Sequence, residues 1–381
     1  MSAAFARTLA RPREREPRRG VACPTVPACA TGHVGVGARE AISREGRLHL
    51  AVRSGPMPDS EETRGYAGFA FLLHPPLWCG DEPAERTKEA LTESIWRSRL
   101  QIGLEISVTR EGLVLIDFSG WHETSKAEAV RDNDIDAIVE MDERRVAVGN
   151  AFLACLHTAL LAEQKMGHRA QVITPAEVVH VTDIGLPDGT VFFFDERPLT
   201  ALVSAALGGA ALDDEKARML IVERATLDVA SGLLDELLGS RAIDGARTAA
   251  LLLRAAKAAE DEEYGLALII AWSLSEQMLN AHWVKYIERQ GASKARIKKL
   301  QERDWTAGVV TETLSIAKEL SDELYTELNA VRRARNRWAH ELRPIAEDEA
   351  HRAVKLAGSM LTSVGGFSLA LRPWRRGSTT P

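Results

Sequence analysis

The sequence lacks long apolar runs and has few cysteines. Its most apolar run, Leu266–Trp272, is closed by Ser273 and falls far short of the roughly 18 apolar residues that a bilayer span requires. The four cysteines have neither the CxxC spacing of a zinc site nor the density of a disulfide scaffold. They are Cys23, Cys29, Cys79 and Cys155. These absences predict a chain without a membrane segment, located in a reducing cytoplasm.

Basic charge is concentrated at the N-terminus. Residues 1–60 contain ten arginines and no lysine against five acidic residues, whereas the whole chain has a net charge of -6. The acidic remainder argues against indiscriminate coating of nucleic acid, but not against a local basic cleft. Because residues 1–64 are rich in Arg, Pro and Gly and lack apolar periodicity, we expect a disordered tail there and another at 373–381. The Arg-rich opening is typical of either a transit peptide or an upstream extension without a structural role.

Residues 65–207 have the pattern of a small α+β domain. Alternating apolar residues predict one hairpin from Leu104–Val108 and Leu113–Phe118, and a second from Val178–Ile184 and Val191–Phe194. Apolar spacing between Ile135 and Leu161 indicates one long helix or a broken pair. No catalytic motif is found here, so a sensing, partner-binding or regulatory role is expected.

Strand signals vanish beyond Asp213, where helix formers dominate. The predicted helices are Glu215–Leu238, Ala246–Ala259, Tyr264–Ile287, Val309–Leu320, Asp322–Leu342 and Asp348–Val364. We interpret 208–244 as a helical connector and 245–372 as a helical bundle. The predicted fold class is therefore multidomain, with a disordered tail, a small mixed α/β domain and an all-α C-terminal domain.

The helix predicted at 322–342 carries a cation on its apolar side. Its apolar stripe comprises Leu324, Leu328, Val331, Trp338 and Leu342. At about 100° per residue, Arg335 lies about 20° from Leu324. A guanidinium cannot lose its charge, so Arg335 needs a partner that is either a buried carboxylate such as Glu276 or an anionic ligand.

Asn336 and His340 stand at i and i+4, so the amide can hold one imidazole nitrogen and leave the other free to exchange protons. Arg335 and His340 are about 140° apart around an ideal helix. To reach the same phosphate, either the turn before Pro344 loosens or two copies of the helix meet across a dimer.

Residues 335–340 read Arg-Asn-Arg-Trp-Ala-His, which matches the RNxxxH signature of HEPN domains. The motif ends a long amphipathic helix before a proline break, and the resemblance extends over about 245–370. It implies a HEPN-type helical bundle that dimerises and cleaves RNA without a metal or cofactor, as toxin and antiviral defence effectors of this family do. It also implies that the RNA 2′-hydroxyl attacks the adjacent phosphate, with His340 as acid or base, Arg335 stabilising the phosphorane and Asn336 orienting.

The resemblance makes Glu276 a candidate support residue in the cleft. Basic side chains of two segments are candidate RNA-binding residues. They either contact the phosphates of a bound strand or form a solvated surface without a binding role. They are Lys294, Arg296, Lys298, Lys299, Arg332, Arg333 and Arg337. The expected partners are RNA, a second copy of the chain and a cognate antitoxin or regulatory protein. The alternative function is a non-catalytic HEPN-like module for dimerisation or RNA and partner binding, with His340 as a favourable cation at a helix C-terminus.

Overall fold

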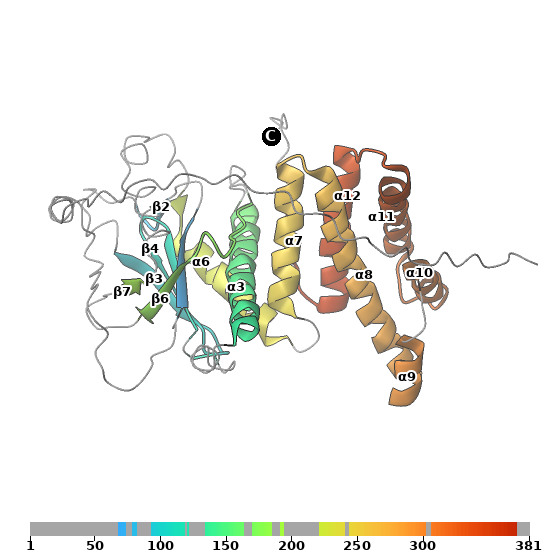
Figure 1. Ribbon diagram of the computed structural model, residues 1–381, viewed down its shortest axis with the longest axis horizontal. Helices are drawn as coiled ribbons and strands as arrows, with labels where there is room; N and C mark the ends of the chain where they lie inside the picture. The colour runs from blue at the N-terminus through green and yellow to red at the C-terminus, as the bar shows by residue number, and fades with distance from the viewer. Residues whose placement is uncertain are drawn as a thin grey trace, which may run out of the picture. The chain divides into compact units, whose positions relative to one another are not determined.

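The computed structural model describes residues 68–73, 78–81, 93–118, 120–121, 134–163, 170–184, 191–193, 221–240, 244–301 and 306–371 (Figure 1). This part of the chain is mostly helical and carries a small antiparallel sheet, as the fold class predicted at the coarse level. The predicted tails at 1–64 and 373–381 lie outside the described residues.

Six strands form the antiparallel sheet in the order β3-β4-β5-β1-β6-β7. They are β1 (Gly68–Leu72), β3 (Ser94–Arg99), β4 (Glu105–Thr109), β5 (Leu113–Asp117), β6 (Val179–Ile184) and β7 (Val191–Phe193). The pairs β4–β5 and β6–β7 confirm both predicted hairpins. A separate parallel pair joins β2 (Trp78–Cys79) to β8 (Ile221–Val222), so the prediction that strands end before Asp213 was wrong.

Two helices cover one face of the sheet. Ser98, Ile106, Ile116 and Phe69 are register partners across four strands, so their side chains point to the same face. The Ser98 hydroxyl hydrogen-bonds that of Ser231 in α6 (Arg224–Gly239), at 2.7 Å. At the other end of this row, Phe69 lies against α3 (Ile135–Ala162), where a Cβ on Gly149 would come within 3.0 Å of the Phe69 ring.

Helix α3 is one continuous helix rather than a broken pair. Its N-cap is Asp134, whose carboxylate accepts a hydrogen bond from Ala137 N at 3.0 Å. By length and composition alone it could cross a membrane, but 78% of its apolar window is buried inside the protein. It is therefore a core helix, and burial also raises the pKa of its Cys155 thiol.

Helix α7 (Gly245–Glu260) packs against α3 on one side and against α8 (Tyr264–Arg289) on the other. Its alanines are buried, and their small side chains permit this close packing. The described residues on both sides of α7 thus share one hydrophobic core. The domain boundaries drawn within 208–244 stay a prediction, although α6 packs against α3 and β3.

The remaining helices pack around α8. They are α9 (Lys294–Gln301), α10 (Ala307–Ile316), α11 (Asp322–Glu341) and α12 (Glu347–Met360), the last continued by the π-helical turn η2 (Leu361–Gly365). Helices α11 and α12 contact each other and α8, while α10 contacts both α8 and α11. The short helix α9 was not predicted.

Candidate functional site

The site-bearing helix is α11, and its N-terminal boundary lies where the sequence placed it. The Ser321 hydroxyl accepts a hydrogen bond from Leu324 N at 3.2 Å, while Asp322 and Glu323 place negative charge in the first turn. Leu328 and Val331 are buried and fix the inner face of the helix. Its regular backbone then continues to Glu341, so residues 335–340 have helical geometry throughout.

The predicted apolar stripe is wrong at its last member. Leu342 is 85% exposed and adopts a left-handed backbone, with φ at 53°. Because the helix ends at Glu341, the Leu342 side chain no longer follows the direction of Leu328 and Val331. The last contact of the stripe is therefore made by Trp338, whose ring lies over the N-terminal turn of α8. A Cβ added at Gly265 would come within 2.9 Å of Trp338 Nε1.

Arg335 is half-buried on the inner side of α11, as the spacing predicted. Its Nε is shielded from solvent and has no hydrogen-bond partner among the described residues. Its Nη1 donates to the Asn336 amide oxygen at 3.2 Å. Glu276 on α8 is also half-buried, yet no ion pair between Glu276 and Arg335 is found in the described part of the chain. Glu276, the carboxylate considered for this role, is therefore not an ion-pair partner of Arg335.

Asn336 and His340 are both exposed, and His340 lies in the last turn of α11. No hydrogen bond between them is found among the described residues, and the Asn336 amide oxygen accepts a hydrogen bond from Arg335 Nη1. Since the helix is unbroken from Arg335 to His340, these side chains leave it about 140° apart. The turn before Pro344 does leave helical geometry, at the left-handed Leu342, but only after His340, so it does not bring His340 toward Arg335.

The candidate RNA-binding residues fall into two groups. On α9, the side chains of Lys294, Arg296, Lys298 and Lys299 are all exposed around one buried residue, Ile297. On α11, Arg332 is held by packing: its Nη2 donates to Asn329 Oδ1 at 3.0 Å, and its Nη1 lies so close to Gly308 of α10 that a Cβ there would clash. All four basic side chains of α9 are therefore accessible to a bound RNA strand, whereas Arg332 of α11 is held by its neighbours.

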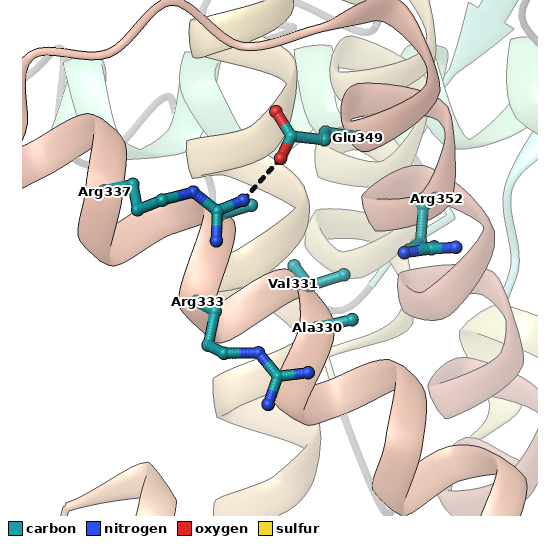
Figure 2. Close-up of a pocket in the computed structure, with 7 residues that line it drawn as sticks. Ala330, Val331, Arg333, Arg337, Glu349 and Arg352 are labelled. Carbon is teal, nitrogen blue, oxygen red and sulfur yellow. Dashed lines mark hydrogen bonds and ion pairs between the residues drawn. The ribbon is translucent and has the colours of Figure 1, made fainter.

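Arg333 and Arg337 line a pocket between α11 and α12 (Figure 2). The Arg337 Nη2 pairs with Glu349 Oε1 at 2.6 Å, and Arg352 lines the pocket from α12. Sequence reasoning missed Glu349 and Arg352. The available signal was the position of Glu349 in the first turn of a helix, where its Oε2 accepts from Ala346 N at 3.2 Å.

No cluster of three or more His, Cys, Asp or Glu side chains suited to a metal ion occurs within the described ranges. Comparisons of the chain with protein-family models, with curated proteins and with solved structures give no match. The geometry of α11 and its neighbours is therefore the basis for a functional proposal.

Proposed function

We propose that the chain is a metal-independent endoribonuclease of the HEPN type, whose site is built from Arg335, Asn336 and His340. The observation that carries the proposal is the half-buried Arg335, whose Nε is buried without a hydrogen-bond partner. A buried polar group left unsatisfied costs about 1–3 kcal/mol, and more if it is charged. Such a cost is typical of functional sites, where a ligand supplies the missing partner.

An RNA phosphate is a suitable partner for this guanidinium. In the proposed reaction, the ribose 2′-oxygen loses its proton to a base and bonds to the adjacent phosphorus, while the bond from phosphorus to the 5′-oxygen breaks. The products are a 2′,3′-cyclic phosphate and a 5′-hydroxyl, the latter protonated by an acid. His340 acts as base or acid because an imidazole titrates near neutral pH. Arg335 stabilises the negative charge of the phosphorane, and Asn336 orients the Arg335 side chain.

A homodimer through the helical bundle forms part of the proposal. Arg335 and His340 diverge by about 140° on one helix, so a second copy is needed for one phosphate to meet both groups. Two leucines near this end of α11 support a contact there: Leu342 is 85% exposed and Leu266, next to the Gly265 that Trp338 covers, is 49% exposed. Covering these two side chains with a second copy would remove apolar surface from water, which favours association.

The biological setting follows from the resemblance to HEPN proteins. We propose a cytoplasmic toxin or antiviral effector, with residues 65–207 regulating it and a cognate antitoxin or regulatory protein as a partner. The basic side chains of α9 would contact the RNA backbone. Glu276, half-buried on α8 and without an ion pair in the described part of the chain, remains a candidate support residue for the cleft.

Replacement of Arg335 by methionine separates catalysis from stability. We expect wild-type protein to cleave single-stranded RNA in EDTA, and Arg335→Met to lower that rate about 100-fold, because the cation opposite the phosphorane is lost. The free energy of unfolding should stay unchanged or rise by up to about 1 kcal/mol, because a buried unsatisfied group is removed. Gel analysis of the RNA and urea denaturation measure the two effects.

The matched control is Arg254→Met, which alters an exposed arginine of α7. It should leave both the cleavage rate and the stability close to the wild-type values. The proposal fails if wild-type protein leaves RNA intact. It also fails if Arg335→Met cleaves normally but loses stability, as a non-catalytic module with a structural arginine would.

A further inference from the structure

The pocket between α11 and α12 is small and rich in guanidinium groups. It has a volume of about 200 Å³ and is lined by Ala330, Val331, Arg333, Ala334, Arg337, Glu349 and Arg352. Figure 2 shows Arg333 and Arg337 reaching from α11, and Glu349 and Arg352 from α12, with Ala330 and Val331 between them. Ala330 and Ala334 contribute only small side chains to this lining.

The charges that line the pocket do not balance. Three guanidiniums face one carboxylate, Glu349, and that carboxylate is engaged by Arg337 at 2.6 Å. Arg352 reaches a second carboxylate, that of Glu327, at 3.4 Å, outside the lining. Arg333 is exposed and forms no hydrogen bond or ion pair in the described part of the chain. The pocket therefore retains a net positive charge that an anion would neutralise.

The pocket lies beside part of the proposed site on α11. Relative to Arg333, helical geometry places the other α11 residues of the lining at about 40° to 160°: Arg337, Ala330, Ala334 and Val331. His340 lies at about -20°, next to Arg333 at the edge of the pocket. Arg335 lies about 160° from Arg333 in the opposite sense. A strand that passes Arg333 would then meet His340, about 10 Å further along the helix axis.

We infer that this pocket binds a phosphate ester group, that of the RNA strand next to the cleaved linkage; this inference rests on the proposed function. Guanidinium groups bind phosphate oxygens through paired, charge-assisted hydrogen bonds, which suits Arg333 and Arg352 on opposite walls. Glu349 holds Arg337 in place and weakens anion binding, because its carboxylate competes for the same guanidinium. The pocket thus positions the strand, whereas Arg335 and His340 act on the scissile phosphate.

The test uses the full chain and a fluorescent 2′-O-methyl RNA, which cannot be cleaved by 2′-oxygen attack. Fluorescence anisotropy at fixed salt should show that the double variant Arg333→Gln/Arg352→Gln binds about tenfold more weakly than wild-type protein. The slope of log affinity against log salt is negative, and its magnitude should decrease by about 1 to 2 because phosphate contacts are lost. Glu349→Gln, which retains an amide oxygen for Ala346 N, should bind a few-fold more tightly.

The control is Arg247→Gln/Arg254→Gln, which removes two exposed arginines of α7 and the same net charge. It should bind RNA as wild-type protein does. The second arm is adenosine monophosphate in a thermal shift assay. If it stabilises wild-type protein but not Arg333→Gln/Arg352→Gln, and these two proteins bind RNA equally, the pocket binds a small phosphate ester rather than the RNA strand. Equal RNA affinity and equal thermal shifts for both double variants would overturn the inference. Failure of the nuclease proposal is separate, because it appears as intact RNA with wild-type protein.

Discussion

Replacement of His340 by alanine should lower the rate of RNA cleavage by at least about 100-fold, because the group that transfers protons to and from the reacting oxygens is lost. His340 is exposed in the last turn of α11, and no bond of its ring to another described residue is found. The thermal midpoint should therefore change little. The rate is measured on single-stranded RNA in EDTA, and the fold is checked by circular dichroism.

Two controls accompany this measurement. His282→Gln changes another histidine, whose Nε2 lies 3.2 Å from the Glu319 carbonyl oxygen, and the amide of glutamine can keep that contact. Cleavage should persist in this variant. An RNA with 2′-deoxyribose at the cleaved linkage should resist wild-type protein, because the attacking hydroxyl is missing. Cleavage of that RNA, or normal cleavage by His340→Ala, would contradict the proposed mechanism.

Replacement of Phe152 by alanine should lower the free energy of unfolding by about 3–5 kcal/mol. Phe152 is fully buried in α3, which packs against α6 and against α7. Because the described residues share one hydrophobic core, we expect a single cooperative unfolding transition that shifts as a whole. Urea denaturation followed by circular dichroism and by tryptophan fluorescence measures both the shift and the coincidence of the two signals.

The matched control on the same helix is Val139→Ala, because Val139 is 50% exposed and should contribute less than about 0.5 kcal/mol. Two separate transitions, of which only one responds to Phe152→Ala, would show that residues 65–207 and 245–372 unfold as independent domains. That result would favour the domain division expected from sequence over a single folding unit.

Local patterns predicted α3, α7, α8 and α11 well because helix signals are local. The helix predicted at Glu215–Leu238 was wrong near its start, because Ile221–Val222 form β8 and α6 begins at Arg224. The cap at Ser321 and the apolar spacing of α11 depend on neighbours within one or two turns. Strand β1 was missed because it is a short run buried on both faces and lacks alternation. Strand β3 was missed because its two buried residues are adjacent, at a register shift, so it lacks alternation as well. Helix α9 was missed because its eight residues are mostly charged and bury mainly Ile297.

The site was predictable along one helix but not between helices. Helical periodicity correctly placed Arg335 on the inner side of α11, yet it could not show that Asn336 binds Arg335 rather than His340. The pairing of Arg337 with Glu349 depends on how α11 and α12 pack. Sequence spacing does not determine such packing, so the arginine pocket became apparent only from the structure.

Mixing two inactive variants, Arg335→Met and His340→Ala, tests most directly whether two copies of α11 build one site. In an equimolar mixture about half of the dimers contain one subunit of each kind, and each mixed dimer has one intact pair of Arg335 and His340 from different subunits. RNA cleavage should then recover to about a quarter of the wild-type rate, because half of the dimers have one of two sites restored. No recovery, although sedimentation or native mass spectrometry shows that mixed dimers have formed, would contradict a site shared between subunits.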